Sequence, residues 1–243
     1  MLRLATLFTF IVAAVLGIAS SARAQGSCRC GDPSFLAIRR VNISSAQSVQ
    51  NCTSYMILDA RGSGEPQGVS LSFQIAIERI IANSTEITTQ SIIYPASFDQ
   101  NVSVGVQNTK YLLLGYSQGA TVVLEALGKL DNETTKAINA VVLVGNPYRT
   151  PGRASNVDSQ GRPDNRTQSG MFAAQAMQAN RTFPNYDDAL DRSGKVRDIC
   201  LEDDLVCAPD PDCDCRLASD HLSYGLVQSV QDLIVSHIMS RAT

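Results

Sequence analysis

The chain has 243 residues, a formal net charge of −3, 44% hydrophobic residues and no tryptophan. Its basic residues form no cluster, so nothing in the composition indicates a nucleic-acid partner. If the first 24 residues are a removable leader, the 219 that remain are enough for one domain with a substantial hydrophobic core.

The N-terminus has the pattern of a secretory signal peptide. A basic start at Met1–Arg3 precedes an apolar stretch from Leu4 to Ile18, and Ala22-Arg23-Ala24 matches a cleavage site. A membrane anchor is the alternative, but the stretch is short and ends in small residues. We therefore predict a signal peptide over 1–24, followed by a secreted single domain over 25–243 with no integral membrane association.

Hydrophobic patterning predicts strands and helices that alternate along the mature chain. The expected elements are a strand at 55–60, a helix at 70–82, strands at 91–95 and 111–115, a helix at 118–130, a buried strand at 138–144, a long surface loop at 149–170, a strand at 196–200 and a helix at 225–240. This alternation predicts the α/β class, as a three-layer α/β/α sandwich with a mainly parallel central sheet. No insertion suited to a lid stands out.

The segment Gly115-Tyr116-Ser117-Gln118-Gly119 lies between a predicted strand and a predicted helix. In that context Gly-x-Ser-x-Gly is typical of a nucleophile elbow, in which two glycines permit a tight turn and the serine hydroxyl is exposed. The simpler interpretation is a turn whose serine caps the helix. The presence of a base and a carboxylate elsewhere decides between the two.

A serine nucleophile needs a histidine base and a carboxylate that orients it. The chain has two histidines. His237 falls in an amphipathic pattern, where we expect it to face solvent from a helix, whereas His221 lies in a loop before that helix. Asp204 lies between Cys200 and Cys207 and, taken alone, could be an exposed acidic residue. With Ser117 these residues follow the order Ser, Asp, His that α/β-hydrolases use.

These motifs together resemble those of the cutinase family, small secreted serine esterases that include acetylxylan esterases. The resemblance rests on Gly115–Ala120, Cys200-x-x-x-Asp204-Leu205-Val206-Cys207, His221-Leu222-x-Tyr224, and Ala60-Arg61-Gly62-Ser63-Gly64-Glu65 after an apolar strand. It implies a minimal, lidless α/β-hydrolase fold with Ser117 as nucleophile, His221 as base and Asp204 as orienting carboxylate. It also implies an oxyanion hole formed by Ser63, through backbone and hydroxyl, and by the backbone N–H of Gln118.

Seven cysteines in a secreted chain should mostly form disulfides. We expect a disulfide between Cys200 and Cys207, because it closes a short loop around Asp204. A Cys-x-Cys at each end of the mature chain could instead hold a metal, but secretion and the scarcity of histidine favour disulfides between Cys28 or Cys30 and Cys213 or Cys215. We expect neither a metal nor an organic cofactor.

Cys52 marks a departure from the family. In cutinases a cysteine at this spacing pairs with one shortly before the elbow strand, yet 104–110 contains none. The connection between the strands expected at 91–95 and 111–115 is also only fifteen residues, 96–110. That is barely enough for a parallel crossover, which usually carries a helix. One missing segment would explain both features; either the lineage lost the helix or the sequence lacks an exon.

The triad does not decide which ester is hydrolysed. A cutinase should carry apolar residues around the acyl site, whereas 149–166 and 213–220 are rather polar. On motif similarity we expect cutin-like polyester or short-to-medium acyl esters, with acetylated plant polysaccharide as the alternative. A catalytically inactive secreted protein on a hydrolase scaffold is a third interpretation. We expect a monomer.

Asn-x-Ser/Thr sequons support secretion of a glycoprotein. Seven are present, at Asn42, Asn51, Asn83, Asn101, Asn132, Asn165 and Asn180.

Overall fold

A computed structural model describes residues 55–100, 112–131, 135, 138–210 and 219–241 of the chain. The expected signal peptide at 1–24 lies outside these residues. So do the cysteines at 28, 30, 52, 213 and 215, whose pairing therefore stays a prediction.

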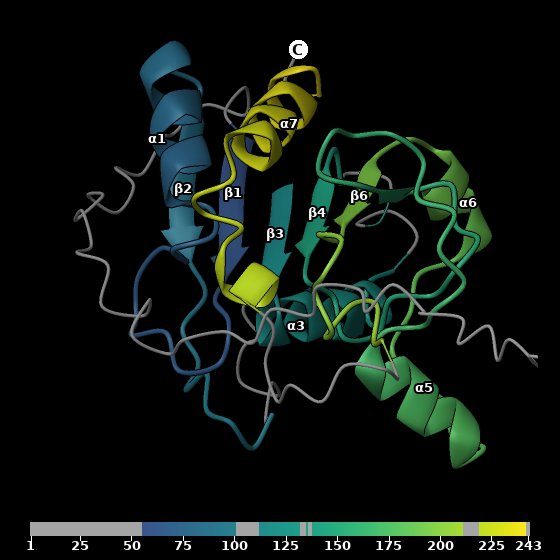
Figure 1. Cartoon of the computed structure of the whole chain (residues 1–243). Helices are drawn as coiled ribbons and strands as arrows, with labels where there is room; N and C mark the ends of the chain where they lie inside the picture. Colours follow the sequence, from purple (N-terminus) through teal and green to yellow (C-terminus); the bar gives the residue numbers. More distant parts are fainter. Residues whose placement is uncertain (1–54, 101–111, 132–134, 136–137, 211–218, 242–243) are drawn as a thin grey trace, which may run out of the picture.

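A six-stranded sheet forms the centre of the fold (Figure 1). Its strands lie in the order β2-β1-β3-β4-β6-β5, and every neighbouring pair is parallel. The strands are β1 (Tyr55–Ala60), β2 (Ile87–Ser91), β3 (Leu112–Tyr116), β4 (Val141–Val144), β5 (Asn156–Val157) and β6 (Val196–Ile199). Because the strands run the same way, their carboxyl ends meet at one edge of the sheet, where the active site of an open α/β sheet is expected.

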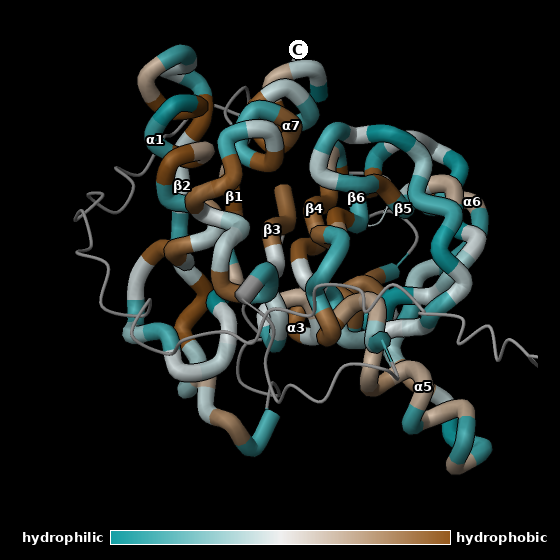
Figure 2. Tube along the Cα trace, in the orientation of Figure 1, coloured by the Kyte–Doolittle hydropathy of each residue, from teal (hydrophilic) through white to brown (hydrophobic). Residues whose placement is uncertain are grey.

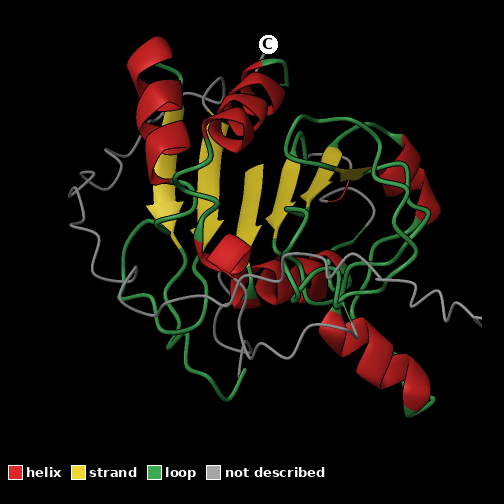
Figure 3. Ribbon diagram, in the orientation of Figure 1, coloured by secondary structure: helices red, strands yellow, loops and turns green. Residues whose placement is uncertain are grey.

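Helices cover both faces of this sheet and complete three layers (Figure 3). On one face α1 (Gln74–Asn83) and α7 (Gln228–Met239) enclose an apolar core with alternate residues of β1 and β3. On the other face a second core packs around α3 (Gln118–Leu127) and α6 (Asp188–Arg192). The remaining helices are α5 (Met171–Gln178) and the 3₁₀ helix η2 (Ser219–Leu222). The expected three-layer α/β architecture is confirmed.

Hydropathy follows this layering (Figure 2). The central strands β3 and β4 are buried at every position, as expected for strands covered on both faces. The helices α1 and α7 mix apolar and polar residues, since one side of each faces the core. Within the part of the chain that the structure describes, no helix combines the length and the apolar character needed to cross a membrane.

Three expectations about individual elements are wrong. The strand expected at 91–95 is β2 at Ile87–Ser91, an edge strand of mixed polarity; the apolar residues that suggested it come after the strand ends, and Ile93 is 64% exposed. The interval 149–170 is not only a surface loop, because it contains β5 and several buried side chains. The helices α5 and α6 have no counterpart among the expected elements.

The connection between β2 and β3 bears on the expected missing segment. Since β2 ends at Ser91 and β3 begins at Leu112, the connection comprises residues 92–111 and is longer than expected. It passes from one side of β1 to the other, because both strands pair with β1. Residues 101–111 lie outside the described part, so the loss of a covering helix stays a prediction.

Candidate active site

Ser117 stands at a sharp turn between β3 and α3. Its backbone has φ 54° and ψ −118°, a positive φ that is costly for any residue with a β-carbon. A Cβ added to Gly119 would lie 2.1 Å from the carbonyl oxygen of Ala60, so the helix can approach β1 only with glycine there. The Ser117 side chain does not cap α3, which excludes the simpler interpretation of the motif.

The side chains of Ser117, His221 and Asp204 form a continuous hydrogen-bonded chain. His221 Nε2 lies 2.9 Å from Ser117 Oγ, while His221 Nδ1 lies 3.0 and 2.9 Å from the two carboxylate oxygens of Asp204. His221 and Asp204 are buried, and Ser117 is partly exposed. The structure thus brings together three residues that lie far apart in the sequence: one directly after β3, one in the loop after β6 and one in η2.

Asp204 is fully buried, yet it is held as a carboxylate. Burial raises its pKa, but His221, through its charge and hydrogen bonds, the hydroxyl of Tyr224 and the backbone N–H of Val206 together lower the pKa below its usual value. Tyr224 Oη donates to Asp204 Oδ2 at 2.6 Å, and the Val206 N–H donates to Oδ1 at 2.8 Å. Because an ionised carboxylate only accepts hydrogen bonds, the proton of neutral His221 must be on Nδ1, which leaves the Nε2 lone pair facing Ser117.

Two further residues, Gly145 and Tyr116, accommodate and hold His221. A Cβ on Gly145 would lie 2.9 Å from Cε1 of His221 and 3.0 Å from Oδ2 of Asp204, so the end of β4 must be glycine for the pair to fit. Tyr116 Oη donates to the backbone oxygen of His221 at 2.6 Å. Glycine at 145 thus leaves room for the ring, and Tyr116 holds the backbone of His221 without using either ring nitrogen.

The loop that carries Ser63 lies against the elbow. A Cβ at the neighbouring Gly62 would be 3.4 Å from Cβ of Ser117. The buried carboxylate of Glu65 accepts the N–H groups of Gly62 and Leu71, at 2.7 and 2.8 Å, and so closes the loop on itself. The hydroxyl of Ser63 accepts a hydrogen bond of 2.8 Å from Gln100.

Gln118 contributes in two ways. As the first residue of α3, it has a backbone N–H without an intrahelical acceptor. Its side chain donates to the backbone oxygen of Ser97 at 2.8 Å, which fastens the segment after β2 to the elbow. The sequence suggested only the first of these roles.

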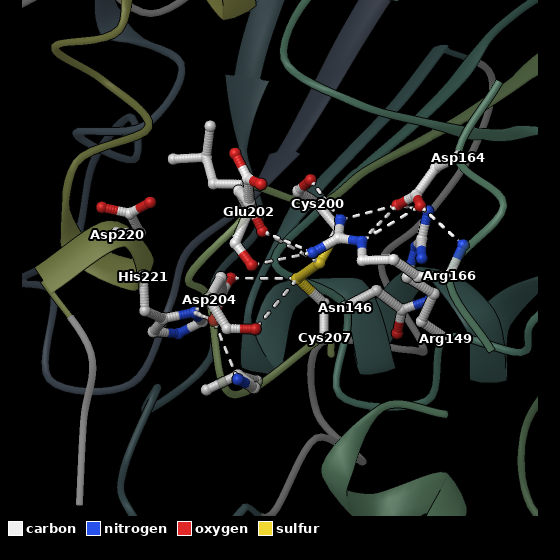
Figure 4. Close-up of a disulfide and its surroundings, with 12 residues drawn as sticks. Asn146, Arg149, Asp164, Arg166, Cys200, Glu202, Asp204, Cys207, Asp220 and His221 are labelled. Carbon is white, nitrogen blue, oxygen red and sulfur yellow. Dashed lines mark hydrogen bonds and ion pairs between the residues drawn. A yellow bond between two sulfur atoms is a disulfide. The ribbon is translucent and has the colours of Figure 1, made fainter. Parts of the chain in front are cut away.

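Cys200 and Cys207 form the expected disulfide, with an S–S distance of 1.99 Å. With Asp204 they are the one group of potential metal ligands found among the described residues. Cysteine binds metals as a thiolate, and both sulfurs are consumed by the disulfide, so this group does not fit a metal ion. The disulfide lies directly against the acid: Cys207 Sγ is 3.1 Å from Asp204 Oδ2 (Figure 4).

Comparison with known proteins supplies the family. The family model described as cutinase matches residues 51–241, which is most of the chain and includes all the site residues above. The chain belongs to the cutinase family.

Curated cutinases match over part of their length. Cutinase cut1 of Trichoderma harzianum is 32% identical over 139 residues, covering 49% of this chain and 55% of that protein. A cutinase of Hypocrea jecorina (strain QM6a) is 33% identical over 118 residues, covering 40% of this chain and 47% of that protein. The chain spans about half the length of the curated relatives it matches.

Solved structures match over more of the chain. A cutinase-like protein from Cryptococcus sp. superposes with a TM-score of 0.68 at 29% identity, over 81% of this chain and 98% of that one. The catalytic core domain of acetyl xylan esterase from Trichoderma reesei superposes with a TM-score of 0.58 at 20% identity, over 79% of this chain and 100% of that one. The second likeness shows the fold alone.

Two expectations about polar residues of this cutinase-family chain are wrong. His237 is buried and does not face solvent, because the turn before β6 covers its side of α7. Its Nε2 lies 2.9 Å from the backbone oxygen of Lys195, and burial lowers its pKa to about 4. Arg149 and Asp164, two of the polar residues of 149–166 that suggested a polar acyl site, are buried and form an ion pair of 2.8 Å.

Several residues that shape the site were not predicted from the sequence. Tyr224 formed part of the family motif, so its position was visible although its role was not. The contacts of Tyr116, Gly145 and Gln100 join segments that are distant in sequence, and no local pattern signals them. Glu65 also formed part of the family motif, and its contacts with Gly62 and Leu71 are local, but its role was not predicted.

Proposed function

We propose that this chain is a serine esterase that hydrolyses carboxylic esters through Ser117, His221 and Asp204. The observation that carries the proposal is the hydrogen-bonded chain from Ser117 Oγ through His221 to the buried carboxylate of Asp204. A nucleophile, a base within hydrogen-bond reach and a group that orients the base are the parts such catalysis needs. Family membership agrees with this chemistry.

The reaction follows from the positions of the protons. His221 Nε2 takes the proton of Ser117 as Oγ attacks the ester carbonyl, and Asp204 stabilises the imidazolium that forms. The imidazolium then gives its proton to the departing alcohol oxygen as the carbon–oxygen bond breaks. The acyl group stays on Ser117 until a water molecule, deprotonated by the same histidine, releases it as a carboxylic acid.

The negative charge of the tetrahedral intermediate needs donors near Ser117. The backbone N–H of Gln118 and the backbone and hydroxyl of Ser63 are the groups that we assign to this task. Gln100 supports the assignment, because its hydrogen bond to Ser63 Oγ leaves the hydroxyl proton free to point elsewhere. Each donor in such a site typically contributes about 3 kcal/mol to the transition state.

Two observations favour an apolar acyl group. Phe98 is 77% exposed, and its ring lies 3.0 Å from the position of a Cβ on Gly64, beside the oxyanion loop. Arg149 and Asp164, which suggested a polar wall, are turned into the protein interior. We therefore place cutin-like polyester or short-to-medium acyl esters before acetylated plant polysaccharide, and an active enzyme before an inactive scaffold protein.

Secretion is part of the proposal. It is supported by the leader-like N-terminus, by the disulfide, and by the sequons that the structure describes, all of which are exposed: Asn83, Asn165 and Asn180. We propose a monomeric, secreted glycoprotein that needs neither metal nor organic cofactor for ester hydrolysis.

The test is ester hydrolysis by wild type, Ser117→Ala and Ser236→Ala. Ser236 is exposed on α7 and serves as the matched control. We expect Ser117→Ala to lower kcat on p-nitrophenyl butyrate by about 10⁴-fold or more, with the control unchanged. Near-native activity of Ser117→Ala would contradict the assignment.

The range of substrates hydrolysed distinguishes the alternatives within this proposal. Turnover of butyrate or longer esters and of cutin would support the cutinase-type reaction, whereas turnover confined to acetate esters and acetylated xylan would favour deacetylation of polysaccharide. A folded wild-type protein that neither hydrolyses these esters nor reacts with a serine-directed phosphonate would be an inactive scaffold protein.

A further inference from the structure

Arg166 connects a buried ionic cluster to the loop that carries Asp204 (Figure 4). Its guanidinium makes hydrogen bonds with all of its N–H groups. Nε and Nη2 donate to the carboxylate of Asp164, at 2.6 to 3.0 Å. The remaining donors reach three consecutive backbone oxygens, those of Cys200, Leu201 and Glu202, at 2.7, 2.9 and 3.0 Å.

These three carbonyls belong to the chain directly after β6 and end two residues before Asp204. The loop has left the sheet there, so strand pairing no longer supplies donors for its oxygens. The hydrogen bonds to Cys200 and Leu201 are partly buried, where a carbonyl without a donor is unfavourable, whereas the one to Glu202 is exposed. Arg166 supplies donors to all three. The guanidinium therefore fixes the path of the backbone between the last strand and the acid.

The other side of Arg166 is anchored in the protein interior. Asp164 is bound to β5 by its backbone N–H, which donates to the oxygen of Asn156 at 3.0 Å, and its carboxylate pairs with Arg149 at 2.8 Å. Arg149 is completely buried and also faces Asp198 of β6, at 3.5 Å. Although burial raises the pKa of Asp164, the two arginines lower it to about 2, so the carboxylate stays charged.

We infer that Arg166 is a positioning residue for Asp204, an inference that rests on the proposed esterase function. No hydrogen bond joins Arg166 to a side chain of the triad; it acts by holding the Cys200–Glu202 backbone, and through it the carboxylate that orients His221. The disulfide and Tyr224 hold the same loop through other groups: Cys200 is bonded to Cys207, and Tyr224 Oη accepts the N–H of Leu201 at 3.0 Å. Arg166 thus ties the acid loop to the far edge of the sheet, where β5 lies.

Arginine is needed for this task. The planar fork can reach a carboxylate on one side and carbonyls on the other at the same time, whereas lysine offers a single ammonium with three donors. Lysine at 166 would keep the charge opposite Asp164 but could not satisfy three carbonyls in a row. A substitution by lysine therefore separates the geometric role from the charge.

The experiment compares Arg166→Gln and Arg166→Lys with Arg162→Gln. Arg162 lies on the same segment and also pairs with an aspartate, Asp158, but its side chain is 74% exposed and it reaches no backbone of the acid loop. Two readouts are needed: kcat and KM on p-nitrophenyl butyrate, and hydrogen exchange measured by mass spectrometry on the 200–207 segment, with α7 as internal reference.

We expect Arg166→Gln to lower kcat about tenfold to 100-fold, with KM within twofold of wild type, because misplacement of the acid affects the chemical step and not ester binding. Exchange in 200–207 should be faster while α7 is unchanged. Arg166→Lys should fall between wild type and Arg166→Gln in both readouts, and Arg162→Gln should match wild type.

The inference would be overturned by wild-type kcat in Arg166→Gln, by equal exchange in the two Gln variants, or by full rescue in Arg166→Lys. If Arg166→Gln does not fold, Arg166→Lys alone must show the kcat loss with faster exchange in 200–207. A wild type without esterase activity or phosphonate reactivity would refute the proposed function instead, and faster exchange in 200–207 would then still establish the tie between Arg166 and the loop.

Discussion

The nucleophile and the acid contact the same imidazole, yet they are held by different kinds of interaction. Ser117 is positioned by backbone geometry: a strand, a turn with positive φ and a helix packed so closely that only glycine fits. Asp204 lies in a loop without regular structure, where side chains from two other segments and a disulfide hold it.

This difference determines how each side responds to substitution. The elbow depends on close backbone approach, so a small added group has no room and the damage is to the fold. The acid loop depends on several hydrogen bonds that act in parallel, so the loss of one should weaken catalysis while the fold survives. Substitutions in the elbow should therefore lower stability, whereas substitutions in the acid loop should lower kcat in a protein that still folds.

The largest effect is expected for Gly119→Ala. The new methyl group would meet the carbonyl oxygens of Ala60 and Arg61, at 2.1 and 2.7 Å, and backbone atoms of β1 cannot move aside. We expect a loss of stability of more than about 3 kcal/mol, with little folded protein recovered. Thermal unfolding, or recovery of soluble protein, measures this effect.

Gly128→Ala is the matched control for that prediction. Gly128 is exposed at the other end of the same helix, with negative φ, and an added Cβ would only come within 3.7 Å of Glu125. Alanine there should be neutral or stabilising by up to about 1 kcal/mol. Equal stability of the two variants would show that the elbow tolerates more than its geometry indicates.

The same contrast explains what could be predicted from the sequence. The elbow and the order of the triad were predictable because Gly-x-Ser-x-Gly and the Asp204 motif are local patterns. The position of β2 was not, because the apolar residues Ile92 and Tyr94 are buried outside any strand. The role of Arg166 has no signature, since its partners on the acid loop are backbone oxygens, which every residue carries.

His237 shows a second limit. Amphipathic spacing predicts that a helix has a covered face, but not which other segments lie against its remaining sides. The turn at Gly194 and Lys195 packs against α7 and buries this histidine. This turn is distant from His237 in the sequence, so hydrophobic periodicity cannot predict that it buries the histidine.

Two buried aspartates, Asp59 and Asp204, extend the contrast. Burial raises the pKa of both side chains, but only around Asp204 do neighbouring groups lower the pKa by more than burial raises it. Asp59, at the end of β1 below the oxyanion loop, has its pKa raised to about 8, mainly by desolvation. One of its oxygens accepts from the N–H of Ser70 at 2.9 Å, while Oδ1 has no hydrogen-bond partner. Asp204 is equally buried, yet His221 and Tyr224 lower its pKa.

Asp59→Asn tests this difference through the pH dependence of stability. The folded state keeps a proton on Asp59 that the unfolded chain loses near pH 3.8, so the wild-type free energy of unfolding should fall between about pH 4 and 8 and level off above. With about 1.4 kcal/mol for each pKa unit, the contribution of Asp59 has an upper limit of about 6 kcal/mol. Denaturant unfolding at a series of pH values measures the slope.

The asparagine side chain cannot ionise, so the Asp59→Asn variant should lack this part of the slope and gain on wild type as the pH rises. Asp204 contributes with the opposite sign: its stabilising effect is present above the unfolded pKa of about 3.8 and is lost as pH falls through its lower folded pKa. A variant with the same slope as wild type from pH 5 to 8 would show that Asp59 is ionised in the folded state.

The smallest effect on stability is expected for Tyr224→Phe, on the acid side. Its hydroxyl bridges the carboxylate of Asp204 and the N–H of Leu201, and phenylalanine would leave both without this partner. An unsatisfied buried N–H costs about 1–3 kcal/mol, and we expect kcat to fall about tenfold. Tyr55→Phe, at the opposite end of β1 from the site, removes a hydroxyl without touching the triad and should leave kcat unchanged.

The outcome for Tyr224→Phe depends on whether the interactions that hold the acid loop act independently of one another. Arg166, the disulfide and Tyr224 bind different groups of the loop: three backbone oxygens, the cysteine sulfurs, and the N–H of Leu201 with the carboxylate of Asp204. The loop should therefore stay in place when one hydroxyl is lost, and kcat should fall while the protein still folds. Combining Tyr224→Phe with Arg166→Gln would then lower kcat by more than the product of the single effects, because each tie limits the damage done by losing the other. A double variant no worse than the more damaging single one would mean that the two side chains act in series on a single contact.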